Sequence, residues 1–468
     1  MGTSYNTNVV TDGLIGCWDA GNRRSYPTTG TMWTDLVGGQ NGTLVNGSDG
    51  SLTFNSAHGG YLEDFDGTDD YITIPDSDYL DSITSAITVS VWVRPCSLAD
   101  RATGVGTIVS KPSHSYWGSP YAAWNMRLRH GTSEGDYGTE TVEFWAAGSY
   151  GGQLYSSSSI PRETWTHIVG TYDGANQKIY INGVLDATDA QTAAIATTAQ
   201  PLLFGTNYGG PGSELLEGSL ANVLIYNRGL TAAEVKQNYE ALKPRFAPRI
   251  TKSGMLANWD AGDPNSYNGG QTWTDTANGF VGPFYNGAGE AISFDPANGG
   301  SLVFDGTDDR IGPIMLPGDY SGTARSIILW VSPDTHEQEM IAFNSADDKF
   351  KATVGQSTSY GAYVFRSDDG GGYPQTGSFA DSLVTVEDWV CLGMTINASD
   401  EIVSMYLNGV SKTGGANGWN FQDDTYIGRS SSGAPWNGKI ATVRLYTKTL
   451  SAAEIMDNFQ KTRGRFGV

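Results

Sequence analysis

The 468-residue chain is poor in cysteine and in positive charge, and each shortage excludes a class of protein. Its three cysteines, Cys17, Cys96 and Cys391, have neither the number nor the spacing of a disulfide framework or a metal site, so we expect buried free thiols. Lysine and arginine number 28 against 50 acidic residues, a formal net charge of −22. Such an acidic chain repels phosphates, so neither nucleic acid nor an anionic membrane is an expected partner.

Long apolar segments are also missing. No stretch approaches the length of a membrane span. The first residues, Met1–Leu14, lack the basic region and the apolar run of a secretory signal peptide. We therefore expect a protein that is made in a cytoplasm and does not leave it by the general secretory route.

The chain instead contains a long internal repeat. The segment GLIGCWDAGNRRSYPTTGTMWTDL, from Gly13, returns as GMLANWDAGDPNSYNGGQTWTDT from Gly254. FDGTDDY at Phe65–Tyr71 returns as FDGTDDR at Phe304–Arg310. Each copy is long enough to be a domain. The predicted organisation is an N-terminal arm (1–12), a first domain (13–246), a linker (247–253) and a second domain (254–468).

The local pattern predicts an all-β fold in both copies. Glycine is abundant at 61 residues, and β-branched and aromatic residues alternate with polar ones in segments such as Ala86–Pro95. Asn182-Gly183 and Asn408-Gly409 are typical of two-residue hairpin turns. One short helix is expected at the end of each copy, beginning at the capping boxes Thr231/Glu234 and Ser451/Glu454.

These motifs, together with TWTHIVGTYDGANQKIYINGV and YNRGLTAAE, resemble the laminin-G-like members of the concanavalin A-like lectin/glucanase superfamily. The resemblance implies two tandem jelly-roll sandwiches, each with one short C-terminal helix. Three further motifs are similar to those of laminin-G-like proteins of tailed phages: WDAGN, NGTLVNG and the final RFGV. That similarity implies a homo-oligomeric virion surface protein, a capsid decoration or a fibre component, that contacts other virion proteins.

Calcium is considered as a ligand because many relatives hold one at the edge of the sandwich, although no cofactor is required. The oxygen ligands would come from two acidic turns, Asp66/Asp69/Asp70 and Asp305/Asp308/Asp309. The alternative is that these aspartates bond to their own backbone, as in ordinary turns. Relatives usually carry an acidic residue just before the last strand, a place that we assign here to Ala221-Asn222 and Ala441-Thr442.

Hydrolysis is not expected. The glucanases of the superfamily place alternating carboxylates on one strand, because the chemistry needs an acid and a nucleophile close together. The nearest pattern is Glu134, Asp136 and Glu140 in EGDYGTE, whose last spacing is too long and whose glycines indicate a turn. The second copy has no equivalent.

Carbohydrate binding is the expected activity, because the first copy holds an extra aromatic segment between His114 and Tyr155. Aromatic faces stack on sugar rings, and tyrosine and tryptophan tolerate a partly wet surface. The candidate binding residues are Tyr116, Trp117, Tyr121, Trp124, Tyr150 and Tyr155. Alternatively, this cluster packs on a neighbouring subunit.

The sequence thus predicts a non-enzymatic virion surface protein that binds host surface polysaccharide. A polysaccharide-active glycoside hydrolase, or the carbohydrate-binding module of one, is the alternative. A purely structural cement protein is the third interpretation. Docking to the particle is assigned to the second domain or to the arm at Met1–Asp12.

Overall fold

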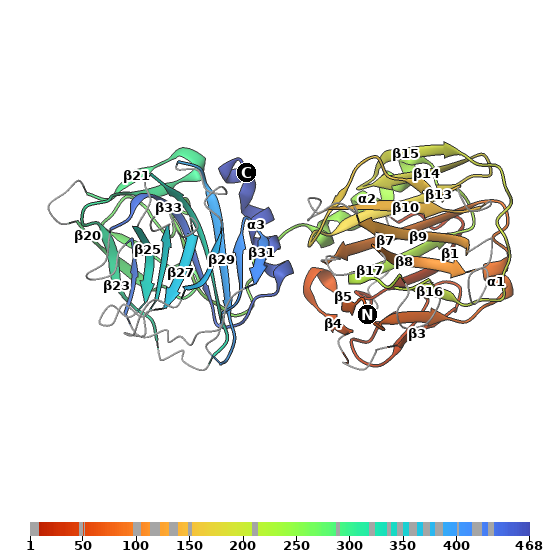
Figure 1. Ribbon diagram of the computed structural model, residues 1–468, viewed down its shortest axis with the longest axis horizontal. Helices are drawn as coiled ribbons and strands as arrows, with labels where there is room; N and C mark the ends of the chain where they lie inside the picture. The colour runs from red at the N-terminus through yellow and green to blue at the C-terminus, as the bar shows by residue number, and fades with distance from the viewer. Residues whose placement is uncertain are drawn as a thin grey trace. The chain divides into compact units, whose positions relative to one another are not determined.

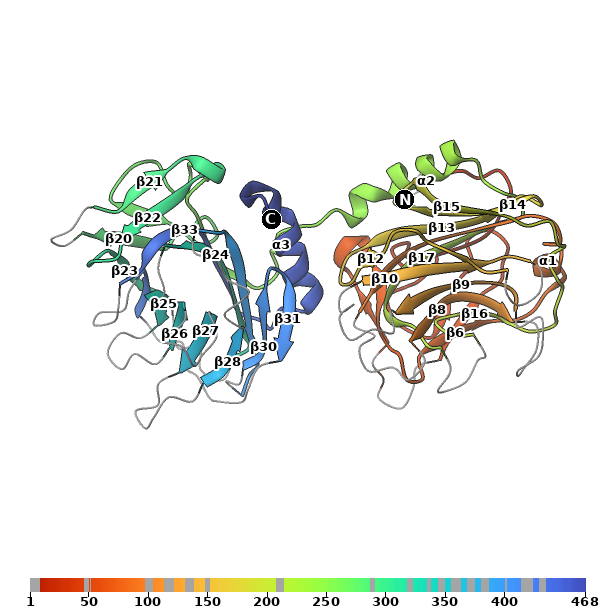
Figure 2. The same ribbon diagram turned by 45° about the horizontal axis from the view of Figure 1, so that its top comes forward.

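The chain folds into two separate units, Met1–Ala247 (domain 1) and Pro248–Val468 (domain 2). The computed structural model describes the following residues: 9–45, 50, 52–96, 104–112, 122–130, 139–147, 152–207, 214–286, 291–317, 323–334, 338–343, 350–354, 363–367, 375–379, 387–399, 402–413, 424–428 and 435–468. Each unit is built from two antiparallel sheets, as Figures 1 and 2 show.

In domain 1 the sheet that carries the helix is called the back sheet, and the other is called the front sheet. The back sheet has the strand order β15 (Val184–Ala190), β14 (Asn176–Ile181), β13 (Thr166–Tyr172), β7 (Ile87–Pro95), β17 (Glu217–Tyr226), β5 (Tyr61–Asp66) and β4 (Thr53–Asn55), with β1 (Leu14–Asp19) pairing with β17. The front sheet has the order β11 (Leu154–Tyr155), β10 (Thr139–Trp145), β9 (Ala122–His130), β8 (Val105–Pro112), β16 (Leu202–Phe204), β6 (Tyr71–Ile74), β3 (Gly42–Val45) and β2 (Met32–Trp33), with β12 (Ile160–Pro161) pairing with β10.

Domain 2 repeats this topology. Its back sheet has the order β21 (Ser293–Asp295), β22 (Ser301–Asp305), β33 (Asn437–Tyr446), β24 (Arg325–Pro333), β29 (Val390–Ile396), β30 (Ile402–Leu407) and β31 (Val410–Thr413), with β18 (Met255–Asp260) pairing with β33. Its front sheet has the order β19 (Thr272–Thr274), β20 (Val281–Tyr285), β23 (Arg310–Met315), β32 (Asp424–Ile427), β25 (Gln338–Phe343), β26 (Phe350–Val354), β27 (Tyr363–Ser367) and β28 (Gln375–Phe379).

The main core of each domain lies between its two sheets. In domain 1, Val89 and Val91 of β7 meet Met126 and Leu128 of β9 and Phe144 of β10, all of them fully buried. Alternate residues along these strands therefore face inward, as a two-layer sandwich requires. The predicted all-β architecture of two tandem jelly rolls is confirmed.

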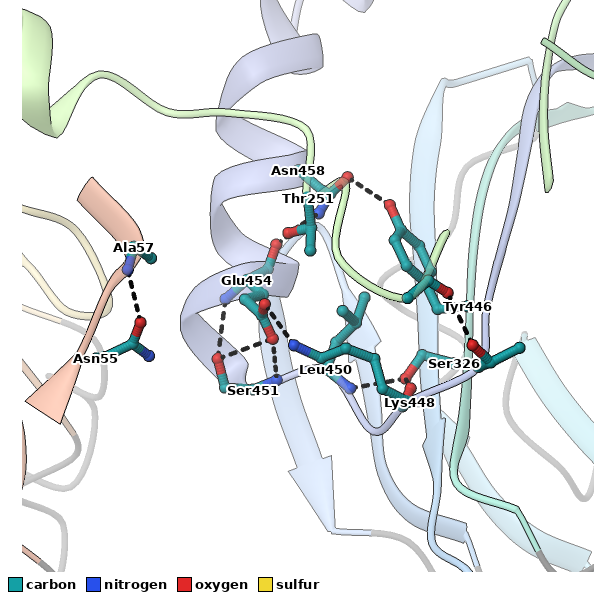
Figure 3. Close-up of polar contacts among 12 residues, drawn as sticks. Asn55, Ala57, Thr251, Ser326, Tyr446, Lys448, Leu450, Ser451, Glu454 and Asn458 are labelled. Carbon is teal, nitrogen blue, oxygen red and sulfur yellow. Dashed lines mark hydrogen bonds and ion pairs between the residues drawn. The ribbon is translucent and has the colours of Figure 1, made fainter. Parts of the chain in front are cut away.

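One long helix per domain begins where the capping boxes predict. In α2 (Ala232–Phe246) the Thr231 side chain accepts from the Glu234 amide, and in α3 (Ala452–Phe466) Ser451 does the same for Glu454. Figure 3 shows the second box, with the Lys448 ammonium 2.7 Å from the Glu454 carboxylate. A shorter helix, α1 (Asp78–Asp81), lies in domain 1. Among the described residues, none of the helices combines the length and the hydropathy needed to cross a membrane.

Each long helix covers the outer face of its back sheet and closes a second, smaller core. Phe246 stacks on Trp92 at 4.2 Å between ring centroids, and Phe466 stacks on Trp330 at the same distance. Two further residues of α2 face the sheet, since Val235 is fully buried and Tyr239 stacks on Trp92.

The arginine before each terminal phenylalanine ties the helix to the sandwich. Arg245 donates through Nε to the His58 carbonyl and through a terminal nitrogen to Asp19 Oδ1, both at 2.7 Å. Arg465 makes the equivalent bonds to the Asn298 carbonyl and to Asp260 Oδ1, also at 2.7 Å. We call this repeated contact set the arginine clasp.

Part of the predicted N-terminal arm is not free. Val9 and Val10 are buried against α2, and the Val10 amide donates to Asn238 Oδ1 at 2.8 Å. In domain 2 a different residue meets the matching asparagine: Asn458 donates to the Thr251 hydroxyl at 3.1 Å (Figure 3). Val9 and Val10 therefore pack with domain 1, where their apolar side chains complete the second core.

The stacked phenylalanine gives a stability prediction. Phe246→Ala should lower the free energy of unfolding by about 3–5 kcal/mol, since it removes a buried ring and leaves a cavity against Trp92. Denaturant unfolding followed by circular dichroism measures this change. Val184→Ala, at a position that is 69% exposed, is the control and should change little. An equal effect of the two substitutions would show that the helix end does not hold the second core.

Candidate functional site

The outer face of the domain 1 front sheet is polar, although its residues are mostly buried. On β9, Trp124, Met126 and Leu128 point into the core, so Asn125 and Arg127 point the opposite way. Cross-strand partners share a face, which extends this surface to the neighbouring strands. The surface, called the polar face, consists of Thr107 and Ser110 of β8, Asn125, Arg127 and Arg129 of β9, Glu143 and Trp145 of β10, and Tyr155 of β11.

Charged groups of both signs form a network on the polar face. Glu143, whose side chain is fully buried, lies with its carboxylate 2.5 Å from Arg129 Nε and 3.8 Å from Arg127. Arg127 also approaches Glu214 at 3.4 Å. Two arginines thus meet two glutamates, and the charge of the face is locally balanced.

Several polar atoms on this face have no hydrogen-bond partner within the described part of the chain. They are Oγ1 of Thr107, both amide atoms of Asn125, Nε of Arg127 and Oε1 of Glu143. Asn125 and Thr107 are fully buried. An unsatisfied buried donor or acceptor costs about 1–3 kcal/mol, so such groups are uncommon without a ligand or a functional role. The arrangement offers donors and acceptors together to a polar ligand.

One aromatic ring stands at the rim of this network. Tyr155 is 47% exposed, lies directly opposite Glu143, and has the Arg129 guanidinium 6.0 Å from its ring centroid. Trp145, on the same face, is 1% exposed and donates its indole N–H to the Ala147 carbonyl. Tyr155 therefore presents the exposed aromatic surface of this face, whereas the ring of Trp145 is buried.

The predicted carbohydrate-binding residues divide into three groups. Tyr155 lies on the polar face. Trp124 belongs to the main core and is 1% exposed, so its selection is wrong: alternation on β9 turns its ring inward. Tyr116, Trp117, Tyr121 and Tyr150 lie outside the described residues. Sequence reasoning missed Asn125, Arg127 and Glu143, although the alternation of apolar and polar residues from Trp124 to Arg129 is a usable signal.

The suspected hydrolase carboxylates do not form a pair among the described residues. Glu140 alternates with the core residues Val142 and Phe144, so it faces inward, whereas Glu143 faces outward. Arg162 lies 2.8 Å from the Glu140 carboxylate. Burial nevertheless raises the pKa of Glu140 to about 7, against the opposing effect of Arg162. Glu134 and Asp136 lie outside the described residues.

Both acidic turns have the geometry of a metal site and the bonding of a turn. In each turn, one oxygen from each of the three aspartates lies within 4.8 Å of the others. Asp66 Oδ1 accepts from the Thr68 amide and Asp305 Oδ1 from the Thr307 amide, both at 2.7 Å. The two interpretations of these turns are therefore compatible.

The position before the last strand was misassigned from the sequence. Ala221 and Ala441 lie inside β17 and β33, which begin four residues earlier, at Glu217 and Asn437. Glu217 is the register partner of Asp66, and Asn437 is the partner of Asp305. An acidic residue therefore does stand at this position in domain 1, and an amide stands there in domain 2.

A hollow of about 300 Å³ adjoins the acidic turn of domain 1, at the edge of the back sheet. Its polar lining includes Asp64, Asp66, Arg94, Glu163 and Glu217. Arg94 already donates to the Ser219 hydroxyl at 3.0 Å and approaches Glu163 at 3.9 Å. This hollow is separate from the polar face, because its residues come from the opposite sheet and its adjoining loops.

The facing antiparallel sheets define a jelly-roll β-sandwich with one polar outer surface. The chain belongs to the concanavalin A-like lectin/glucanases superfamily, whose Laminin_G_3 model matches residues 66–236 and 291–456. No match was found among curated proteins.

Solved structures with similar folds include domain 4 of AbnA, a GH43 extracellular arabinanase from Geobacillus stearothermophilus, in complex with arabinotriose. It is 20% identical over 44% of this chain and 99% of its own, with a TM-score of 0.35. The botulinum neurotoxin serotype G binding domain is 13% identical over 94% of this chain and 99% of its own, with a TM-score of 0.40.

The inward carboxyl of Glu140 gives a pH-dependent stability prediction. Its folded-state pKa of about 7 lies above the usual value of about 4.5, so the folded state holds the proton more tightly. Stability from this group is therefore present below about pH 4.5 and is lost as pH rises through 7, by at most about 3 kcal/mol. Glu140→Gln should remove this loss in unfolding measured across that range.

The control for Glu140→Gln is Glu240→Gln, at a side chain that is 53% exposed. It removes the same formal charge from a solvated position. If both variants keep the wild-type slope of stability against pH, the buried carboxyl does not titrate in this range.

Proposed function

We propose that this protein binds glycans without hydrolysing them, and that the polar face of domain 1 is its binding surface. The observation that carries the proposal is the group of buried polar atoms around Asn125 that have no hydrogen-bond partner among the described residues. Sugars carry hydroxyl groups that donate and accept at once. They would satisfy the Asn125 amide, the Arg127 Nε and the Glu143 oxygen together.

The chemistry of the face also limits the kind of sugar. Arg127 and Arg129 are matched by Glu143 and Glu214, so the surface has no strong field of one sign. This balance favours a neutral or weakly charged saccharide over a polyanion. The half-exposed ring of Tyr155 adds an apolar plane at the rim, on which the C–H face of a sugar would stack.

The same geometry favours binding over cleavage. Glycoside hydrolysis with two carboxylates needs both groups in one site, where they flank the scissile bond about 5–10 Å apart. On β10, Glu140 and Glu143 project to opposite faces of the sheet. Hydrolysis remains the alternative function. It is tested by incubating the protein with each polysaccharide that it binds and assaying the reducing sugar released.

The setting in this proposal is the surface of a tailed-phage particle, with the chain as a homo-oligomeric decoration or fibre component that contacts host polysaccharide. The support for this setting is that the motifs WDAGN, NGTLVNG and RFGV resemble those of laminin-G-like phage proteins. An antibody against the chain should label intact particles. Particles that contain no such chain would overturn this part and leave the binding activity to be judged alone.

Tyr155→Ala tests the rim of the surface. Isothermal titration with the polysaccharide that binds best in a host-envelope glycan panel should show about tenfold weaker binding, since one aromatic contact is worth roughly 1.4 kcal/mol. Tyr285→Ala is a matched control, because Tyr285 is also 47% exposed beneath an arginine, but in domain 2. Equal loss in both variants would contradict the assignment to domain 1.

Asn125→Ala tests the centre of the surface and separates binding from structure. Removing the unsatisfied amide should leave the melting temperature unchanged or raise it, while binding weakens roughly 10- to 100-fold. A variant that is less stable but binds normally would make Asn125 a structural residue. A wild-type chain that binds no glycan in the panel would sink the proposal and favour a structural decoration protein.

A further inference from the structure

The two carboxylates of the charge network on the polar face come from different parts of the fold. Glu143 belongs to β10, whereas Glu214 lies in the loop between β16 and β17. The Glu143 side chain is fully buried and serves both Arg127 and Arg129. The Glu214 side chain is 23% exposed and lies 3.4 Å from Arg127. Glu214 is therefore the carboxylate of the pair that faces solvent, where a ligand would approach.

Several contacts fix the position of Glu214. Its carbonyl accepts from the Thr107 amide at 2.8 Å, and its carboxylate accepts from Asn207 Nδ2 at 3.1 Å. Asn207 is fully buried, and its own Oδ1 accepts from the Ser110 hydroxyl at 2.6 Å. Asn207 thus connects β8 to the Glu214 carboxylate and holds that carboxylate beside Arg127.

Glu214 lies at a strained backbone position that the fold does not require to be acidic. Its φ is +51°, in the left-handed region that a residue with a side chain adopts only at a cost in free energy. Domain 2 repeats the topology, yet its sequence between Gly428 and Asn437, RSSSGAPW, contains no acidic residue. A carboxylate at this point is therefore not needed to build the sandwich, and a role in binding is a reason for its presence.

Glu214 decides the net charge of the network. The two arginines (+2) and Glu143 (−1) would by themselves leave a net charge of +1, which the Glu214 carboxylate cancels. An arginine without a counter-charge binds carboxylates strongly, because its planar fork matches their geometry. A carboxylate already beside Arg127 removes that attraction and repels a second negative charge, and both effects are stronger at a partly buried surface than in water.

We propose that Glu214 sets the charge selectivity of the polar face: it excludes acidic saccharides, such as those with uronic acid residues, and reserves the surface for neutral ones. Asn207 is the positioning residue that holds the Glu214 carboxylate beside Arg127. This inference rests on the proposed glycan binding, and it assigns to one loop residue the class of saccharide that the surface accepts.

The test measures binding of the full chain to the host-envelope glycan panel by isothermal titration, with each acidic glycan also supplied in its carboxyl-reduced, neutral form. The wild type should bind the reduced forms at least about tenfold more tightly than their acidic parents. Glu214→Gln should strengthen binding of the acidic forms at least about tenfold and change binding of the reduced forms by less than about threefold. Because the gain depends on the charge of Arg127, it should shrink as the salt concentration rises.

The matched control is Glu217→Gln. It removes the same charge three residues away, but Glu217 lines the hollow at the edge of the back sheet. It should leave the ratio of the two affinities unchanged. Asn207→Ala should shift that ratio in the same direction as Glu214→Gln. In the Glu214→Gln background it should cause no further shift, because a positioning residue acts only through the group that it holds.

The inference alone is overturned if the wild type binds reduced glycans but Glu214→Gln keeps the wild-type ratio, or if Glu217→Gln shifts the ratio equally. A wild type that prefers the acidic forms also overturns it. A chain that binds neither form of any glycan overturns the proposed function together with this inference. Should Glu214→Gln fail to fold, as judged by circular dichroism, Glu214→Gly replaces it, because glycine adopts a φ of +51° without strain.

Discussion

The main core takes every second side chain from the strands of both sheets, and this constraint decides what the remaining side chains can do. On β9 the side chains of Trp124, Met126 and Leu128 pack in the main core. Asn125 and Arg127, which alternate with them, therefore lie on the outer face of the sheet. On β10 the same rule sends Glu140 inward and Glu143 outward. The polar face is thus a consequence of packing: the apolar half of each strand holds the other half in register as one surface.

The second core determines which outer surface remains for a ligand. In both domains the helix ends in an arginine and a phenylalanine. The ring stacks on a sheet tryptophan, and the guanidinium binds carbonyls and an aspartate of the first strand region. The outer face of each back sheet is therefore occupied by its own helix. In domain 1 this leaves the front sheet as the outer surface on which polar groups can gather.

The two copies keep this framework and differ in the residues placed on it. Domain 1 has a bulge in β5, where Asp64 has a φ of +64°, and its side chain lines the acidic hollow. Domain 2 pairs β22 with β33 regularly, and Oδ1 of Asp309 has no hydrogen-bond partner in the part of the chain that the structure describes. A duplicated sandwich can separate roles in this way, because neither change disturbs the shared cores.

Local sequence was sufficient for the features that neighbouring residues decide: the repeat, the asparagine-glycine turns, and the capping boxes at Thr231 and Ser451. Family motifs then predicted the tandem jelly roll. Of the candidate site, Tyr155 could be named from the sequence. Trp124 could not be told from Asn125 without knowing which face of β9 lies in the core. The start of the last strand, the partners of Glu217 and the burial of Asp309 depend on strands far apart in the chain. Tertiary structure alone decided these features, since register and burial arise only when distant strands pack together.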